Sequence, residues 1–206
     1  MDLAKFRLYL QKNLSKKRLS HSQKVMHIMG SAAKIYDLKY TEAMAAGLLH
    51  DIGREWQMSK ILEILQRYDP DLLEQTPADC QVMSYLHGPA GAFIVQQMWG
   101  HEIRSKEVIR AIREHAGNFA DMGFLSRCLH IADVLAPVRD YAGREKLAKL
   151  FMQGRIDEAD LLQCHFLHDF YQTNSWTVHP VWKQRKQMLE QIVGEKPPEF
   201  FSREAA

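Results

Sequence analysis

Ten histidines are the first feature of this chain that points to chemistry. Histidine is the side chain that most often binds transition metals, and it also moves protons near neutral pH. Four of these histidines and two aspartates stand where the apolar stripes of expected helices turn toward a core. An isolated buried carboxylate is costly unless it is paired or binds a cation, so one shared metal site would offset that cost for the whole set. The six residues are His21, His50, Asp51, His87, His115 and Asp133.

Helical spacing explains why these side chains would face inward. His21 precedes Val25 by four residues and Asp133 follows Leu129 by four residues, so each shares the apolar face of its helix. Imidazole and carboxylate groups are ligands for Mn, Fe, Co, Ni or Zn, and the ligand types alone do not select among these metals. The residues themselves therefore predict a metal site without naming its ion.

The other histidines have a simpler interpretation, because a single histidine on an apolar face is more often a hydrogen-bonded core residue than a ligand. His165 and His168 are three residues apart and could chelate, but no inward-facing partner accompanies them. A His-Asp pair arises by chance about 0.6 times in a chain of this composition, and His168-Asp169 is a second one. The prediction of a metal site therefore rests on the six residues taken together and on their order along the chain. We assign structural or surface roles to His27, His101, His130 and His179.

The apolar spacing is helical along nearly the whole chain, and no alternating stretch bounded by hairpin turns stands out. It predicts an all-α globule of about nine to eleven helices. We expect one domain over residues 1–206, with a core at about 18–139 and a helical appendage at about 140–206. Within the appendage we expect a linker at residues 173–180 and a loosely held tail at residues 195–206.

Local signals predict several helix boundaries. Thr41 is expected to cap a helix, and Pro77 and Pro89 are each expected to begin one at its first helical position. Pro137 is expected to stop the helix before it. Gly194 should end the last of three later helices, which are expected over about 143–152, 157–171 and 181–193.

Composition excludes several classes of protein. The formal net charge of the 206 residues is only +2, which argues against a polybasic surface for nucleic acid or membrane. No apolar run approaches the roughly 20 residues that a membrane-spanning helix needs. Three cysteines that stand far apart indicate reduced thiols, so we expect a cytoplasmic protein. These cysteines are Cys80, Cys128 and Cys164.

Five segments of the chain resemble the HD-domain metal-dependent phosphohydrolases. The resemblance is closer still to the bacterial YqeK-type HD proteins, which are symmetrical diadenosine tetraphosphatases. It covers about residues 18–150 and continues through Pro137 and Arg139. The five segments are RLSHS at 18–22, AGLLHDI at 46–52, LHGPAGA at 86–92, AIREH at 111–115 and IAD at 131–133.

This resemblance implies an HD-like helical fold and a role for each of the six residues. His21, His50, Asp51 and Asp133 would hold one metal ion, and Asp51 would also be a candidate bridging ligand. His87 and His115 would serve a second ion or the phosphate side of the site. The resemblance favours iron, or a similar divalent or trivalent ion. The residues expected to take part in catalysis are Asp51, His87, His115 and Arg54.

The same resemblance implies a nucleotide substrate whose phosphates meet arginine side chains. Arg54 stands where the family has lysine, and its planar guanidinium can hold a phosphate through two hydrogen bonds. Arg18 and Arg139 are the further candidates for phosphate binding. The expected reaction is hydrolysis of diadenosine tetraphosphate to two ADP molecules, and the protein could act as a homodimer.

Departures from the family pattern leave the substrate open. Residues 116–118 read Ala-Gly-Asn where the family has Thr-Thr-Gly, Ala136 replaces a glutamate, and Gly53 replaces an alanine. The alternative substrates are a nucleoside monophosphate or a guanosine alarmone. An alternative from another class is a non-catalytic helical protein that binds a metal or a nucleotide.

Overall fold

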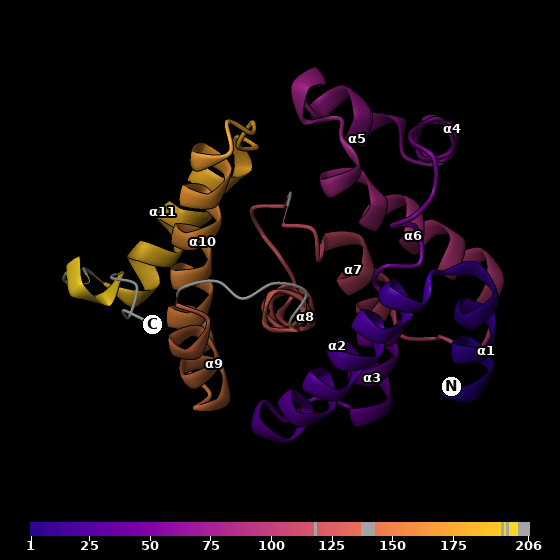
Figure 1. Ribbon diagram of the computed structural model, residues 1–206, viewed down its shortest axis with the longest axis horizontal. Helices are drawn as coiled ribbons and strands as arrows, with labels where there is room; N and C mark the ends of the chain where they lie inside the picture. The colour runs from indigo at the N-terminus through magenta and orange to yellow at the C-terminus, as the bar shows by residue number, and fades with distance from the viewer. Residues whose placement is uncertain (118, 137–142, 195, 197, 202–206) are drawn as a thin grey trace.

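The structure is a computed structural model that describes residues 1–206 except 118, 137–142, 195, 197 and 202–206 (Figure 1). The described residues form eleven α-helices and two short 3₁₀ helices and contain no strand, which confirms the predicted all-α class. The helices are α1 Leu3–Asn13, α2 Lys16–Ile35, α3 Tyr40–Leu49, α4 Met58–Tyr68, α5 Pro70–Gln75, α6 Met83–Trp99, α7 Lys106–Glu114, α8 Phe124–Leu135, α9 Arg144–Met152, α10 Ile156–Thr173 and α11 Val181–Val193. The 3₁₀ helices are η1 Ala78–Cys80 and η2 Pro198–Phe200.

Helix α8 occupies the middle of the molecule. Figure 1 shows it nearly end-on, with α1 to α7 on one side and α9 to α11 on the other. It packs against α2, α3, α7, α9 and α10. Among the described helices, none combines the length and the apolar character that crossing a membrane requires.

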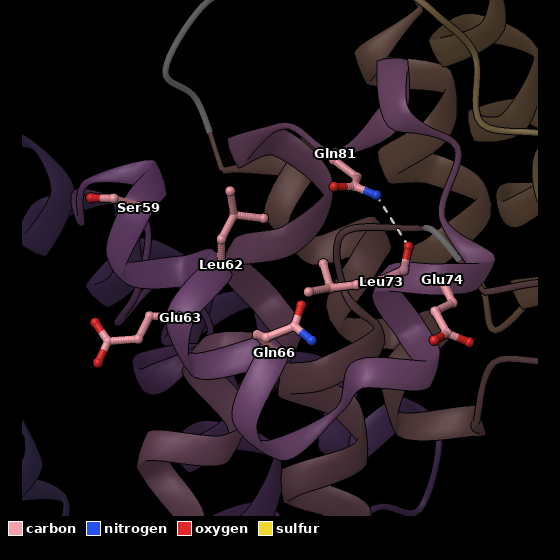
Figure 2. A pocket seen from close by; sticks show the side chains of 7 residues that line it. All are labelled: Ser59, Leu62, Glu63, Gln66, Leu73, Glu74 and Gln81. Carbon is pink, nitrogen blue, oxygen red and sulfur yellow. Dashed lines mark hydrogen bonds between the residues drawn. The ribbon is translucent and has the colours of Figure 1, made fainter.

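Helices α4 and α5 form a smaller apolar cluster with α6. Its buried side chains include Ile61, Leu65 and Leu86. A hollow of about 620 Å³ lies beside this cluster. Figure 2 shows the side chains that line it, among which Gln81 Nε2 donates to the carbonyl of Leu73 at 3.1 Å. The hollow is lined by Ser59, Leu62, Glu63, Gln66, Leu73, Glu74 and Gln81.

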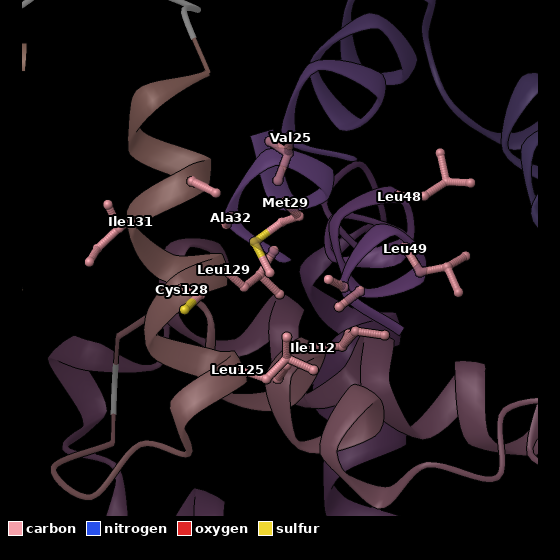
Figure 3. Packing of buried hydrophobic residues seen from close by; sticks show 14 of the residues in the cluster. Val25, Met29, Ala32, Leu48, Leu49, Ile112, Leu125, Cys128, Leu129 and Ile131 are labelled. Carbon is pink, nitrogen blue, oxygen red and sulfur yellow. The ribbon is translucent and has the colours of Figure 1, made fainter. Parts of the chain in front are cut away.

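The main hydrophobic cluster joins side chains of α1, α2 and α3 with side chains of the helices from α6 to α10. In Figure 3, Met29 of α2 lies among side chains of α3, α7 and α8, such as Leu49, Ile112 and Leu129. Phe6 of α1 and Phe151 of α9 belong to the same cluster and are fully buried. Residues before, within and after the expected core at 18–139 therefore share one apolar interior.

Helices α2 and α3 approach so closely that only a glycine fits between them. A β-carbon on Gly47 of α3 would lie 2.8 Å from Cα and 2.9 Å from N of Met26 in α2. Main-chain atoms cannot swing aside as a flexible side chain can, so a substitution here must separate the two helices. This contact sets the distance between His21 on α2 and His50 at the end of α3.

Three predicted helix starts are wrong. Pro89 lies inside α6, which begins six residues earlier at Met83, because burial of the segment from Tyr85 to Ala92 outweighs the hydrogen bond that proline removes. Thr41 is the second residue of α3, whose N-cap is Lys39. Pro77 precedes only the short 3₁₀ helix η1. The predicted later helices over about 143–152, 157–171 and 181–193 are confirmed within a few residues as α9, α10 and α11.

Two side chains in the described part of the C-terminal tail contact the rest of the protein. Lys196 forms an ion pair with Glu158 at 2.5 Å, and Phe201 packs edge-on against His165 with ring centroids 3.8 Å apart. Both contacts reach α10. Aromatic and charged side chains thus join these residues to α10, and the loosely held tail stays a prediction.

Buried charges fasten the C-terminal hairpin, which we define as α10 and α11, to the rest of the fold. Asp160 of α10 is fully buried and accepts hydrogen bonds from Arg127 of α8 at 2.7 Å and from Arg185 of α11. Burial alone would raise the pKa of Asp160, but these two guanidinium groups outweigh it and lower that pKa. At the hairpin turn, the hydroxyl of Tyr85 on α6 donates to the carbonyl of Thr177 at 3.1 Å.

We predict that Gly47→Ala destabilises the protein by about 1–3 kcal/mol, because the added methyl group overpacks the α2–α3 contact. The matched control is Gly30→Ala in α2, where the added carbon would meet side chains and no main-chain atom, namely the exposed Tyr40 ring at 3.3 Å and Cγ of Met44 at 3.5 Å. That control should be near neutral or slightly stabilising, because alanine favours helix more than glycine does. Urea unfolding measures both free energies, and equal effects would contradict the prediction.

We predict that Asp160→Asn destabilises the protein by about 3–5 kcal/mol, because it removes the carboxylate that pairs with the buried Arg185 and leaves Arg127 with Asp157 alone. The control Asp157→Asn removes a more exposed carboxylate from the same Arg127 and should cost less than about 1 kcal/mol. Because the folded pKa of Asp160 is depressed, its stabilising contribution is present above about pH 4 and is lost as the pH falls through that lower pKa. Acid unfolding of the Asp160→Asn variant should therefore be less steep than that of the wild type.

Candidate metal centre

The ends of two helices and the faces of three others deliver the six histidine and aspartate side chains to one place. His50 directly follows α3 and Asp51 comes next in the turn, while His115 directly follows α7. His21, His87 and Asp133 lie within α2, α6 and α8, which are the helices packed around those two ends. The structure thus brings together all six residues that the sequence singled out.

One group of contacts surrounds the Asp133 carboxylate. His21 Nε2 lies 2.7 Å from Asp133 Oδ1, and His50 Nε2 lies 3.4 Å from the same oxygen. His50 Nε2 is also 3.4 Å from Asp51 Oδ2. The ligand atoms of His21, His50 and Asp133 all lie within 4.8 Å of one another, which is close enough for one metal ion to bind all three.

A second group surrounds the other oxygen of Asp51. His87 Nε2 lies 3.1 Å from Asp51 Oδ1, and His115 Nε2 lies 4.0 Å from it. The two imidazoles meet each other at 2.9 Å between their Nε2 atoms. The ligand atoms of His50, Asp51 and His115 form a second candidate set within 4.8 Å. Asp51 therefore faces both groups with different oxygens.

Main-chain carbonyls orient three of the imidazoles. The Nδ1 atoms of His50, His87 and His115 each lie 2.8 Å from a carbonyl, which belongs to Gly47, Met83 and Ile112 respectively. A carbonyl only accepts, so each Nδ1 carries a hydrogen and each Nε2 faces into the site. Metal-binding histidines are held in the same way in proteins generally.

The donor set fits a metal ion. His50 Nε2 is fully buried and has no hydrogen-bond partner among the described residues, although it faces two carboxylates. A nitrogen left in this state is costly, and a bound cation would satisfy it together with the carboxylates. Imidazole nitrogen and carboxylate oxygen are ligands that iron, manganese, cobalt, nickel and zinc all accept, so the site does not select among them.

The charges inside the site depend on one another. Burial would lower the pKa of His50, but Asp51 and Asp133 outweigh it and raise that pKa to about 10. Burial would raise the pKa of both carboxyl groups, but the surrounding imidazoles hold those pKa values well below their usual range. Burial and the neighbouring His87 and His50 lower the pKa of His115 well below its usual value. Without an ion, protons on imidazole therefore supply the positive charge.

Access to the site lies on the side of Asp133 and Arg18. His50, Asp51 and His115 are each at most 3% exposed, whereas the Asp133 side chain is 32% exposed and that of Arg18 is 25% exposed. Arg18 Nη1 donates to Asp51 Oδ2 at 2.5 Å. An incoming anion would meet this guanidinium at the mouth of the site.

The predicted phosphate-binding arginines have different surroundings. Arg54 Nη1 donates to the carbonyl of Met83 at 3.2 Å and lies 3.3 Å from His87 Nδ1, so Arg54 borders the second group. Arg139 lies outside the described residues. The carboxylates of Glu63 and Glu74 line the hollow in Figure 2, which contains no predicted site residue and has the wrong charge for a polyphosphate.

Two positions that depart from the family pattern have a visible packing reason. A β-carbon on Gly53 would lie 3.0 Å from the carbonyl of His87 and 3.3 Å from the ring of Trp56, so the tryptophan occupies the space of the alanine side chain. Ala136 is buried at the end of α8. Asn118 lies outside the described residues.

The remaining histidines divide into exposed and buried ones. His27 and His101 are exposed. Among the described residues, His165 and His168 belong to no group of three metal ligands. His130 and His179 are buried, and His130 Nδ1 lies 2.7 Å from the carbonyl of His115. Sequence reasoning missed this contact, because the position of His130 on the inward face of α8 says nothing about the carbonyl it meets.

Comparison with known proteins shows that the cluster lies within a segment that matches a known family. The HD domain family model matches residues 18–138, which contain all six histidine and aspartate residues of the cluster. The chain is 29% identical over 161 residues to a symmetrical bis(5'-nucleosyl)-tetraphosphatase of Staphylococcus aureus, covering 77% of this chain and 79% of that protein. It is 26% identical over 159 residues to the protein of the same name in Halalkalibacterium halodurans, covering 76% and 82%.

A solved structure shares the same architecture. The crystal structure of a predicted HD superfamily hydrolase involved in NAD metabolism from Clostridium acetobutylicum superposes with a TM-score of 0.83 at 26% identity. The superposition covers 93% of this chain and 98% of that one, so it includes the C-terminal hairpin as well as the helices around the cluster.

We predict that metal binding releases protons and weakens as the pH falls. The raised pKa of His50, about 10, means that its imidazole is protonated at pH 7 in the metal-free protein, and a ligand imidazole must be neutral. Affinity should fall about tenfold per pH unit for each proton displaced. Calorimetric titration with Mn²⁺ in buffers of different ionisation enthalpy counts the protons, and a pH-independent affinity would contradict the prediction.

The same pKa predicts how the metal-free protein responds to alkaline pH. The folded pKa of His50 lies above the unfolded value of about 6.5, so its stabilising contribution is full below pH 6.5 and is lost as the pH rises through about 10. Thermal unfolding in a chelator should show this loss, and saturating metal should reduce it.

Proposed function

This chain belongs to the HD domain family, and from that premise we propose that it is a metal-dependent phosphohydrolase that splits diadenosine tetraphosphate into two ADP molecules. The observation that carries the proposal is the convergence of six histidine and aspartate side chains, from five helices, inside the segment that the family model matches. Relatives named for this symmetrical reaction align with 77% and 76% of the chain and support the choice of substrate.

We assign metal binding to the two groups described above. His21, His50 and Asp133 would hold one ion with Asp51, and His115 and His87 with Asp51 would hold a second ion or face the phosphate. A bound ion supplies positive charge beside the phosphate and makes water acidic enough to attack as hydroxide. We favour iron among the candidate metals on the family resemblance alone.

Asp51 would be the central residue of the site. Its two oxygens face different imidazoles, and Arg18 Nη1 contacts Oδ2. This position lets one carboxylate orient both groups and, through Arg18, hold a guanidinium at the mouth of the site. Arg18 would then meet the phosphates and spread their charge as the anhydride bond breaks.

His87, His115 and Arg54 would act on the departing half of the substrate. The two Nε2 atoms lie 2.9 Å apart, so a proton held by either one would face the same space. That proton is available to the bridging oxygen that leaves with one ADP, while the oxygen of water ends on the phosphorus of the other. Arg54, beside His87, would neutralise charge on the same phosphate.

A second candidate substrate is a dinucleotide with a shorter phosphate bridge, such as NAD. The structural neighbour from Clostridium acetobutylicum, described as involved in NAD metabolism, favours it. The central site is compatible with either bridge, because both contain a phosphoric anhydride. We place the reaction in the cytoplasm, which the three free cysteines support.

We predict that Asp51→Asn lowers hydrolysis of diadenosine tetraphosphate at least ~100-fold, because it removes the charge that faces both groups. The matched control is Asp169→Asn in the second His-Asp pair, whose carboxylate is exposed and lies on α10. The control should keep wild-type turnover. Circular dichroism checks that both variants remain helical, and undiminished turnover by a folded Asp51→Asn protein would contradict the assignment.

The products decide the substrate. Purified protein loaded with Fe²⁺, Mn²⁺ or Co²⁺ is incubated with diadenosine tetraphosphate, NAD, a nucleoside monophosphate and a guanosine alarmone, and the products are separated by chromatography. We expect ADP alone from diadenosine tetraphosphate. AMP with ATP would contradict symmetrical cleavage, faster turnover of another substrate would replace the proposed one, and binding without turnover would favour a non-catalytic protein.

A further inference from the structure

The carbonyl of the site residue His115 has a dedicated partner outside the site. His115 directly follows α7, where the last four carbonyls of a helix lack a partner within the helix. His130 of α8, which is 4% exposed, brings its Nδ1 to 2.7 Å from the carbonyl oxygen of His115. Because that oxygen only accepts, the hydrogen of His130 lies on Nδ1. His130 thus holds the main chain from which the His115 imidazole extends.

The residues after His115 pass close to the imidazole of His130. Gly117 has a φ of +79°, and a β-carbon there would lie 2.8 Å from Cε1 of His130 and 2.9 Å from Cζ2 of Trp182. The chain therefore passes His130 with no room for a side chain. Both the conformation and the close approach require glycine at this position.

Side chains of the C-terminal hairpin contact His130 and the chain close to it. Gln163 of α10 donates from Nε2 to the carbonyl of His130 at 3.0 Å, and the Trp182 ring of α11 lies edge-on to the His130 ring with centroids 5.8 Å apart. Arg185 of α11 donates to the carbonyl of Ala120 at 3.4 Å. The hairpin lies beyond residues 18–138, yet it fixes the connection that follows a site histidine.

The contacts of the His115 side chain leave the imidazole little freedom to move once the His115 carbonyl is held. Its Nδ1 donates to the carbonyl of Ile112, and its Nε2 lies 2.9 Å from His87 Nε2. A metal ligand must sit within a few tenths of an ångström of its ideal place, and a catalytic group misplaced by 1 Å loses about 100-fold in rate. A small shift of the end of α7 would therefore displace the His115 imidazole from its place in the site.

We propose that His130 is a positioning residue for His115, and that its Nδ1–H bond to the His115 carbonyl transmits support from the C-terminal hairpin to the second group of the metal centre. This proposal rests on the proposed function for its kinetic consequences, but not for its consequences in metal binding. It gives the hairpin a role in the site although, among the described residues, no hydrogen bond or ion pair of the hairpin reaches the six directly.

Two variants of His130 separate positioning from packing. In His130→Asn the side-chain amide can place an N–H near the position of Nδ1, whereas His130→Leu has similar bulk and no donor. Leu162→Ala, a fully buried position of α10 in the main hydrophobic cluster, is the control for lost stability. Each metal-free protein is titrated with Co²⁺ and followed by visible absorption, by thermal unfolding and, with diadenosine tetraphosphate, by kcat and KM.

We expect His130→Leu to weaken Co²⁺ binding about 10–100-fold, to change the Co²⁺ spectrum and to lower kcat more than it raises KM. His130→Asn should restore most of the affinity and the wild-type spectrum. Leu162→Ala should lose stability but keep the spectrum. The proposal is overturned if His130→Leu binds Co²⁺ as the wild type does, if His130→Asn is as impaired as His130→Leu, or if Leu162→Ala changes the spectrum equally.

The outcomes also distinguish this proposal from the proposed function. A wild type that binds Co²⁺ and responds to these substitutions but hydrolyses no nucleotide would refute the function and keep the positioning role. If the wild type hydrolyses the substrate and His130→Leu behaves as the wild type does, the function is kept and the positioning role is refuted. In the metal-free protein, ¹⁵N NMR of the imidazole should show His130 protonated on Nδ1, and protonation on Nε2 would refute the hydrogen bond itself.

Discussion

Charge balance around one buried and one partly buried carboxylate is the constraint on which this structure depends. Asp51 is 3% exposed, and both of its oxygens and one oxygen of Asp133 face imidazole nitrogens. Burying these carboxylates without positive charge would cost more than ordinary apolar packing returns. Protons on the histidines meet this demand when no ion is bound, and a metal ion would meet it by displacing those protons. The same balance therefore links folding, metal affinity and pH.

Helix ends make this arrangement precise. His50 and His115 each follow the last residue of a helix, where unpaired carbonyls are available to accept from Nδ1. The same hydrogen bond thus gives a helix-end carbonyl its partner and turns Nε2 toward the centre of the site. Gly47 and Gly88 then let neighbouring helices approach until the imidazoles meet, since a β-carbon on either would lie within 3.0 Å of main-chain atoms.

The C-terminal hairpin contributes rigidity rather than ligands. It is fastened to α8 by buried charges at Asp160, to α6 through Tyr85, and to the chain after α7 through Arg185. Helices α6 and α7 are the ones that present His87 and His115. A segment with no residue in the cluster therefore contacts α8, which carries Asp133, a residue of α6, which carries His87, and the connection that follows His115.

Helical periodicity and residue type are local properties, so the helical class, most helix positions and the six residues of the cluster could be predicted from the amino-acid sequence. It misjudged Pro89, because burial of α6 by distant helices outweighs the local preference of proline. Only the tertiary structure decided which atoms meet: His21 and Asp133 are 112 residues apart and 2.7 Å from each other. It also decided that Arg18 rests on Asp51 and that His130 holds the carbonyl of His115. Such contacts depend on how whole helices cross, and no spacing along one helix encodes the crossing of two.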